Sequence, residues 1–260
     1  MEAGSDTNVD VDKCHEHEYA SRRDRDDLLF TQPEVSFSCF GDCPICFLPM
    51  PLDEKKTLTF PCCGKFICLG CIYAVIQRPC PFCRHPPALA PAQAETDAKL
   101  KRRAKANDPI ALSQMGHINY SKGDYAKAFQ YWTNSARLGI VQAHYRLSVL
   151  YKNGDGVEKD EKKRVFHLEE AAIAGHPDAR YNLGAIEWNY GSKERAVKHF
   201  IIAANLGEGE LSLKMLKQGY AEGIVSKEDF AAALRAYQAA ADAMKSPQRD
   251  EAYENLREVK

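Results

Sequence analysis

The sequence lacks any apolar run that approaches the roughly eighteen residues a membrane-spanning helix needs. Its formal net charge of −1 leaves no strong electrostatic field toward nucleic acid or a membrane surface. Residues 1–20 contain no apolar core of the kind found in secretory signal peptides. We therefore expect an intracellular protein, cytoplasmic or nuclear, whose partners include neither a membrane nor nucleic acid.

Common catalytic patterns are missing as well. No Ser-His-Asp order, phosphate-cradling glycine loop or pair of carboxylates stands out along the chain. Four histidines in the second half lack metal-ligand spacing, and we expect each to be a packing or surface residue. They are His117, His144, His167 and His199. The second half is therefore not expected to hold an enzyme active site.

Cysteine, in contrast, is concentrated in one short segment. Eight of the ten cysteines form three C-x-x-C pairs and one adjacent pair. They are Cys43, Cys46, Cys62, Cys63, Cys68, Cys71, Cys80 and Cys83. A C-x-x-C pair offers two thiolates from one tight turn, and four thiolates make a closed tetrahedral zinc site. The pattern predicts two structural Zn²⁺ ions with no open position for a substrate.

The size of this segment makes metal binding a condition for its folding. About forty residues rarely bury enough apolar surface to fold unaided, so each structural site is expected to supply on the order of 10 kcal/mol. Four disulfides are the alternative, but they require an oxidising compartment, which the first twenty residues do not favour. The spacing alone leaves open which cysteines share an ion, because interleaved and sequential pairings both give two quartets.

The order of these cysteines resembles a RING finger. A RING usually has C-G-H-x-x-C where this chain reads Cys63-Gly64-Lys65-Phe66-Ile67-Cys68, and a protonated lysine cannot bind zinc. The segment is therefore more similar to the all-cysteine RING variant, with Cys62 and Cys63 as third and fourth ligands. Cys39 and His85 are alternatives for one of those two places. The resemblance implies a cross-brace, in which residues 43, 46, 68 and 71 hold one zinc and residues 62, 63, 80 and 83 the other.

The same resemblance implies a function. A RING holds a ubiquitin-conjugating enzyme and its thioester-linked ubiquitin in a reactive geometry and contributes no nucleophile. By position, the contacts to the conjugating enzyme would be Ile45, Val75, Ile76 and Pro81. Arg84 follows the eighth ligand and resembles the linchpin that donates hydrogen bonds to both enzyme and ubiquitin. The alternative is a non-catalytic zinc-binding scaffold, in which these residues only cover the zinc sites.

A sequence repeat runs through the second half of the chain. Equivalent positions at Ala111, Ala143, Ala179 and Leu211 are spaced by 32, 36 and 32 residues, a period typical of helix-pair solenoids. Small residues recur where helices approach, and glycines recur where the second helix of each pair should end. The pattern resembles Sel1-like repeats, relatives of the tetratricopeptide family, which implies that this half binds a protein substrate or adaptor. The third copy departs from it, since its G-x-G-V turn has shrunk to Gly191-Ser192.

These observations predict a mainly α protein, in which a small two-zinc RING-like module precedes an α-solenoid of about four helix pairs. The expected divisions are a disordered tail (1–38), the RING-like module (39–86), a linker and connecting helix (87–107), the solenoid (108–245) and a C-terminal tail (246–260). Cys14, His15 and His17 are expected to be chance ligand types in the tail. The basic cluster at 99–105 is read as a solvated helix face, with a nuclear localisation signal as the alternative.

Overall fold

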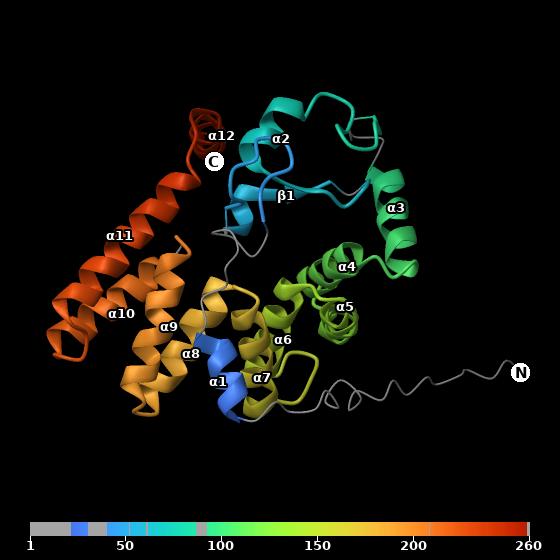
Figure 1. The fold of residues 1–260 in the computed structure, drawn as a ribbon. Helices are drawn as coiled ribbons and strands as arrows, with labels where there is room; N and C mark the ends of the chain where they lie inside the picture. The colour runs from blue at the N-terminus through green and yellow to red at the C-terminus, as the bar shows by residue number, and fades with distance from the viewer. Residues whose placement is uncertain are drawn as a thin grey trace, which may run out of the picture.

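The computed structural model describes residues 22–30, 41–51, 53–60, 62–86, 93–207 and 209–258. Helices dominate it, and most of them form consecutive antiparallel pairs (Figure 1). The predicted fold class, mainly α with a solenoid of helix pairs, is confirmed. Within the described residues no helix is both long and apolar enough to span a bilayer.

The cysteine-rich module comprises the described residues from 41 to 86 and contains little regular structure. After the short helix η2 (Glu54–Lys56), strands β1 (Thr57–Thr59) and β2 (Phe66–Cys68) pair antiparallel, and α2 (Leu69–Val75) follows directly. Its core is small and includes three of the cysteines. The buried members are Cys43, Met50, Ile67, Cys68, Cys71 and Ile72. So small a core agrees with the expectation that something besides apolar burial holds the module together.

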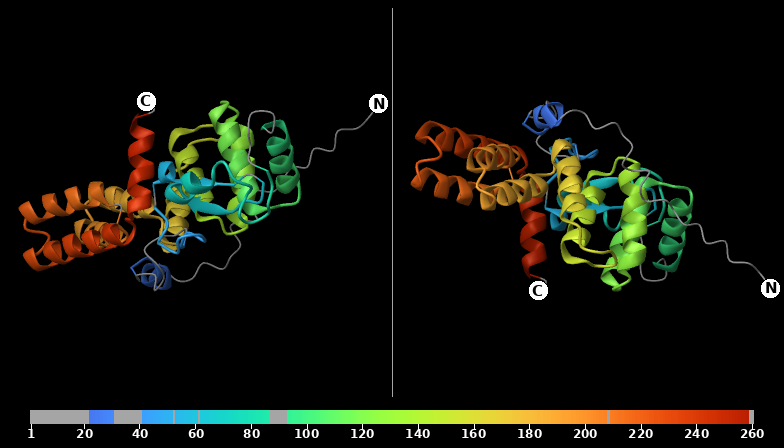
Figure 2. Two further views of the ribbon diagram at one scale, coloured as in Figure 1. Left: turned by 90° about the horizontal axis from the view of Figure 1, so that it is seen from above. Right: turned by 90° about the horizontal axis from the view of Figure 1, so that it is seen from below.

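Four helix pairs make up the second half. They are α4 (Pro109–Ser121) with α5 (Tyr125–Arg137), α6 (Val141–Asn153) with α7 (Glu161–Ile173), α8 (Pro177–Asn189) with α9 (Lys193–Asn205), and α10 (Glu210–Ala221) with α11 (Lys227–Ala243). Helix α3 (Gln93–Lys105) precedes them, where a connecting helix was predicted, and α12 (Pro247–Glu258) follows. In Figure 2 the α10–α11 pair projects from the rest of the array.

Small residues let the helices of a pair approach. A Cβ added to Gly116 of α4 would lie 2.3 Å from the indole Nε1 of Trp132 on α5, and one added to Gly184 of α8 would lie 2.6 Å from the ring of Phe200 on α9. Both aromatic rings are buried. The glycine of the first helix thus makes room for a large ring of the second, in equivalent places of two repeats.

Two terminal segments differ from what the sequence predicted. Within the expected disordered tail, residues 22–30 form helix α1 (Arg22–Phe30), which contacts α7 and α9. The remaining parts of that tail, 1–21 and 31–38, lie outside the described residues, as do Cys14, His15 and His17. In the expected C-terminal tail, α12 packs against α2 of the cysteine-rich module. The physical reason is tertiary contact, since Leu29 and Arg249 are both buried against residues far away in sequence.

The cysteine-rich module lies between the two ends of the helical array (Figure 1). On one side α12 covers α2, and on the other a nitrogen of Lys99 on α3 lies 2.7 Å from Nδ1 of His85. The module is therefore held by helices from both ends of the chain's second half.

Candidate metal centres

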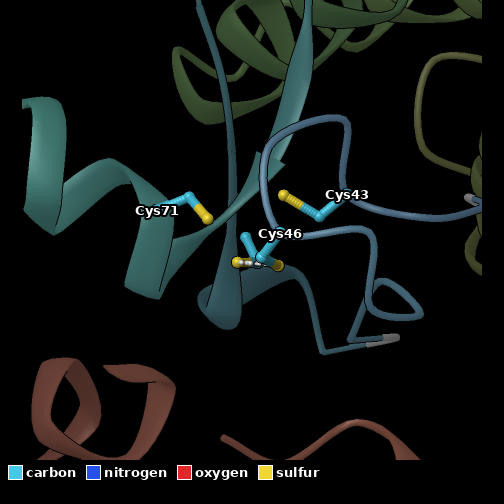
Figure 3. A group of neighbouring side chains, drawn as sticks. Cys43, Cys46 and Cys71 are labelled. Atoms are coloured by element: carbon cyan, nitrogen blue, oxygen red, sulfur yellow. Dashed lines mark hydrogen bonds between the residues drawn. The ribbon is translucent and has the colours of Figure 1, made fainter. Parts of the chain in front are cut away.

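The first group of cysteines gathers residues from two separate parts of the module. Cys43 and Cys46 come from one turn, while Cys68 ends β2 and Cys71 lies in the first turn of α2. Their four sulfur atoms all lie within 4.8 Å of one another. Figure 3 shows Cys43, Cys46 and Cys71 pointing toward a common point. This group is called quartet 1 below.

The second group, quartet 2, is built in the same way. Cys62 and Cys63 lie before β2, whereas Cys80 and Cys83 follow α2, and again the four sulfurs lie within 4.8 Å of one another. Among the described residues these two are the only clusters of at least three potential metal ligands that are this close.

The turns that present the sulfurs share one backbone geometry. In quartet 1, the amide of Phe47 donates to the carbonyl of Cys43, and Phe47 has a φ of 56°. In quartet 2, the amide of Arg84 donates to the carbonyl of Cys80, and Arg84 also has a φ of 56°. The left-handed residue after each of these two C-x-x-C pairs turns the chain back, so both sulfurs of the pair face the same side.

The structure thus brings together the eight cysteines that the sequence singled out, in the interleaved grouping that the RING resemblance implies. Of the alternatives left open, sequential pairing does not correspond to either quartet. His85 belongs to neither quartet, because its ring contacts Lys99. Cys39 lies outside the described residues.

The distances within the quartets fit a tetrahedral zinc ion. Four sulfurs ~2.3 Å from one zinc lie about 3.8 Å from each other. The structure has 3.8 Å between the sulfurs of Cys46 and Cys68, and 3.7 Å between those of Cys63 and Cys80. The donor set, four thiols and no oxygen, is the one that structural zinc sites favour.

The pKa values of the thiols also favour a bound cation in the quartets. Burial raises the pKa of Cys71 to about 12, and burial together with the neighbouring thiols raises the pKa of Cys62. The hydrogen bond with the Cys68 thiol lowers the pKa of Cys43 to about 4, so quartet 1 favours a single thiolate that its neighbouring thiols stabilise. Several thiolates therefore do not coexist in these pockets without a cation. A Zn²⁺ ion held by these sulfurs would supply that cation and would favour the thiolate form of its ligands.

A buried arginine lies against quartet 1. Arg249 of α12 is 1% exposed, and its Nη2 donates to the sulfur of Cys46 at 3.4 Å. Its other hydrogen bonds go to the carbonyls of Leu48, Pro49 and Met244. No carboxylate of the described residues forms an ion pair with it. A buried guanidinium needs a countercharge, and four thiolates around a divalent ion carry net negative charge, so the arginine fits a zinc-loaded quartet.

Another arginine, Arg103, packs against the loop that carries Cys62 and Cys63 of quartet 2. A Cβ on Gly64 would lie 1.8 Å from Nη2 of Arg103, whose Nε and Nη2 both bind a carboxylate oxygen of Asp108, at 2.9 and 2.8 Å. Arg103 and Lys99 belong to the basic cluster that the sequence suggested was a solvated face or a localisation signal. These two side chains are instead half-buried against the cysteine-rich module.

The residues predicted to contact a conjugating enzyme differ in exposure. Ile45 and Val75 are half-buried and pack against the module's core. Ile76 is 61% exposed, and Pro81 and Arg84 are exposed too. Sequence reasoning missed Phe47, which is 76% exposed directly after Cys46. The sequence feature that could have indicated Phe47 is an aromatic residue directly after a C-x-x-C pair.

The four histidines singled out in the sequence lie among aromatic and histidine rings. His117 packs on Trp132, His144 and His167 lie beside each other, and His199 is buried against Phe30. None of them belongs to a metal-ligand cluster within the described residues.

The fold therefore defines a helical-repeat protein that carries a cysteine-rich module. The model of the Sel1 repeat family matches residues 109–140, 141–176 and 177–208, so these helix pairs are Sel1 repeats. The fourth pair, α10–α11, lies beyond the matched segments. No family model for a RING-type zinc finger matches the chain. Sel1 repeats generally mediate protein–protein interaction, and the repeat region is a protein-interaction scaffold.

Curated relatives share only part of this chain. Chitin synthase regulatory factor 4 of Schizosaccharomyces pombe is 31% identical over 81 residues, covering 31% of this chain and 13% of that protein. DAP3-binding cell death enhancer 1 of Rattus norvegicus is 25% identical over 172 residues, covering 51% and 34%. Protein SHC1 of Saccharomyces cerevisiae is 32% identical over 100 residues, covering 36% and 19%. The matches thus span at most 34% of these relatives' own length.

Two solved structures are similar in fold. A Sel1 repeat protein from Oxalobacter formigenes has a TM-score of 0.48 and 22% identity, over 64% of this chain and 79% of that one. The protective antigen c5321 from uropathogenic Escherichia coli has a TM-score of 0.44 and 20% identity, over 65% and 36%.

Proposed function

We propose that this protein is a RING-type ubiquitin ligase that binds two zinc ions. In this proposal the cysteine-rich module recruits a ubiquitin-conjugating enzyme, and the Sel1 repeats hold a protein substrate or adaptor. The observation that carries the proposal is the interleaving of the two quartets, since the four pairs of cysteines along the chain belong alternately to quartet 1 and quartet 2. Sulfur–sulfur distances of 3.8 and 3.7 Å support zinc as the ion.

The proposed mechanism is positional. The thioester belongs to the conjugating enzyme and its ubiquitin, and an acceptor amine attacks the thioester carbonyl, releasing the enzyme's thiol. This chain would hold the two reactants in a favourable orientation. Ile76 and Pro81 offer exposed apolar contacts, while Ile45 and Val75 support them from the core. Zinc supplies structure and no chemistry, because each quartet is closed.

Arg84 has the exposure and backbone geometry for the linchpin role. Its side chain is exposed, and its left-handed backbone fixes where that side chain leaves the turn of quartet 2. A guanidinium offers several donors in one plane, so it can bind two carbonyl oxygens of different proteins together.

A non-catalytic scaffold is the second candidate. It is favoured by the absence of a match to RING family models and by the presence of Sel1 repeats. One of the relatives is named for binding DAP3, which is a protein-binding role. In this reading the cysteine-rich module is a zinc-stabilised joint between the two ends of the repeat array, and no conjugating enzyme docks on it.

An autoubiquitination assay separates the two candidates. Zinc-loaded full-length chain is incubated with activating enzyme, ubiquitin and a panel of conjugating enzymes, and ubiquitin chains are detected by immunoblotting. The ligase reading expects transfer with at least one conjugating enzyme and none after zinc removal. Absence of transfer with every conjugating enzyme, from chain shown to hold two zinc ions, leaves the scaffold.

A further inference from the structure

Helix α1 packs against α7 and α9 of the Sel1 repeats, more than a hundred residues away in sequence (Figure 1). The surface that it covers, formed by residues of α7, α8 and α9, is called the groove below. Its residue Leu29 is 3% exposed, whereas the adjacent Leu28 is 53% exposed. Leu29 enters a socket whose walls come from α7 and α8. They are Leu168, Ala171, Ala172, Ala179 and Leu183. The alanines leave the space that the leucine fills, so the contact is specific to one side of α1.

Charged residues on both sides of the socket match those of α1. Arg25 donates to Glu169 at 2.6 Å and to Glu170 at 2.9 Å, both on α7. Asp26 accepts two hydrogen bonds from Arg195 of α9, at 2.9 and 3.0 Å. The groove thus meets α1 with Glu169 and Glu170 on α7 and with Arg195 on α9, and the opposite charges in a ligand helix set its orientation.

A buried cation meets the end of α1. Arg180 of α8 has no exposed surface, and its Nη1 donates to the main-chain carbonyl of Leu29. Its Nε and Nη2 have no hydrogen-bond partner within the described part of the chain. The last carbonyls of a helix lack partners inside the helix and form its negative end. A buried guanidinium aimed at them suits a ligand that ends a helix at this point.

The residue after Leu29 completes the fit. The ring of Phe30 lies 4.9 Å from that of His199. The guanidinium carbon of Arg195 lies 4.9 Å, and Nζ of Lys198 lies 5.2 Å, from the centre of the Phe30 ring. Two cations this close to one aromatic ring favour a phenyl group over an aliphatic side chain there.

We propose that the groove between α7, α8 and α9 is a binding site for a short helix of a partner protein, and that α1 occupies it in cis. The partner helix would end in a buried leucine followed by an aromatic residue, with an arginine four residues before the leucine and an aspartate next to that arginine. A helix of nine residues is marginal on its own, so α1 depends on the groove. A partner helix of the same chemistry displaces α1.

Attachment in cis raises the effective concentration of α1 at the groove above that of a free ligand helix. A partner must therefore bind well enough to overcome that advantage, or α1 must be released first. This inference rests on the repeat region being a protein-interaction scaffold and does not depend on ubiquitin transfer.

The test uses a fluorescent peptide of residues 20–31 and full-length chains, with binding followed by fluorescence anisotropy. The chain carrying Leu29→Ala and Phe30→Ala loses the cis contact and is expected to bind the peptide at least ten-fold more tightly than the wild-type chain. The matched control is Leu28→Ala, which changes an exposed leucine of the same helix and should behave as wild type. Equal affinity for all three chains, or no binding to the doubly substituted chain, overturns the proposal.

A charge exchange tests the orientation of the bound helix. Adding Arg195→Asp to the doubly substituted chain should weaken the wild-type peptide at least ten-fold, and a peptide carrying Asp26→Arg should recover most of that loss. If the peptide carrying Asp26→Arg binds this chain no better than the wild-type peptide does, the bound helix does not pair its residue 26 with residue 195, and the proposed orientation is wrong. The assay contains neither ubiquitin nor a conjugating enzyme, so its failure and that of the ligase proposal are separate outcomes.

Discussion

The guanidinium of Arg249 donates to the sulfur of Cys46 across a separation of 203 residues in sequence. Through this contact the last helix reaches quartet 1 of the cysteine-rich module, and Gln248 of the same helix donates to the carbonyl of Gly70 in α2. A Cβ on Gly70 would lie 3.0 Å from the Cα of Arg249, so a side chain at this position would push the two helices apart by a few tenths of an ångström.

The first prediction concerns this arginine. Replacing Arg249 with methionine keeps much of the side chain's volume but removes its charge beside the thiolates. Removal of one partner of a buried charge pair typically costs about 3 kcal/mol, so we expect faster loss of zinc from quartet 1. The rate is measured by zinc transfer to a chromophoric chelator. We expect an increase of at least ten-fold for one of the two ions.

Two further variants calibrate that measurement. Arg249→Lys keeps the charge and should give an intermediate rate. Glu251→Gln changes an exposed residue of the same helix and should leave the rate unchanged. Wild-type release kinetics in Arg249→Met would show that the arginine does not balance the charge of the quartet.

The second prediction tests which cysteines share an ion. Replacing Cys46 and Cys68 by serine removes two ligands of quartet 1, so the chain should keep one zinc. Replacing Cys46 and Cys62 removes one ligand from each quartet and should weaken both sites. Native mass spectrometry of each variant counts the bound ions. Sequential pairing reverses the two results, because residues 46 and 62 would then share one ion.

The sequence was informative where a pattern has a single physical use. Thiols in C-x-x-C pairs have few roles besides metal binding, so their spacing predicted two quartets that the fold then assembled. The repeat was equally readable, because a glycine such as Gly116 must face a ring such as Trp132 for two helices to pack closely. Both signals are local or strictly periodic.

The sequence was uninformative where ordinary residues are used in unusual places. Leu29 follows a run of charged residues that cannot form a core by themselves, and Arg249 lies in a polar stretch and is of a type that is mostly exposed. Their burial depends on a socket and a thiolate cluster formed by segments more than a hundred residues away. Similarly, nothing in the basic cluster at 99–105 indicates that Arg103 packs on Gly64. Such contacts follow from the assembled fold alone.

The third prediction concerns ubiquitin transfer. Arg84→Asn removes the cation but keeps a residue type that tolerates the left-handed backbone at this position. Ile76→Ala removes an exposed apolar side chain and is a cleaner test than a substitution at half-buried Ile45. If the ligase proposal holds, each variant should slow ubiquitin discharge from the conjugating enzyme at least ten-fold while zinc content and helicity stay unchanged.

Arg78 provides the matched control for the third prediction, since it is an exposed arginine of the same module outside the ligand turns. Arg78→Ala should transfer ubiquitin at the wild-type rate. Equal rates of ubiquitin discharge with Arg84→Asn, Ile76→Ala and Arg78→Ala would show that Arg84 and Ile76 do not contact the conjugating enzyme, even if the wild-type chain is active.

The last prediction concerns acid. His176 is 4% exposed, its Nε2 lies 2.7 Å from the side-chain oxygen of Gln142, and its ring stacks on Tyr145. Burial, with a smaller contribution from the charge of Arg146, lowers the pKa of His176 to about 3. The neutral ring donates from Nε2 to Gln142, and its Nδ1 has no hydrogen-bond partner among the described residues. A second proton would therefore be buried without an acceptor.

The direction of the pH effect follows from the protonation of His176 in the unfolded and in the folded chain. The unfolded chain protonates this histidine below about pH 6.5, whereas the folded chain stays neutral until about pH 3. Stability contributed by the neutral ring is complete above pH 6.5 and is lost progressively as the pH falls toward the folded pKa. Between pH 7 and pH 4.5 the loss should be about 2.5 kcal/mol.

His176→Asn removes the titration and keeps a residue that is favourable at a helix start. Urea unfolding followed by circular dichroism, at pH 7 and pH 4.5, gives the free energy of unfolding of each chain. Acid also releases zinc, but it does so in both chains, so the difference between them isolates the histidine. We expect the gap in free energy between wild type and His176→Asn to shrink or reverse at the lower pH. Parallel losses in the two chains would mean that the folded protein accepts a proton at His176, contrary to the burial described here.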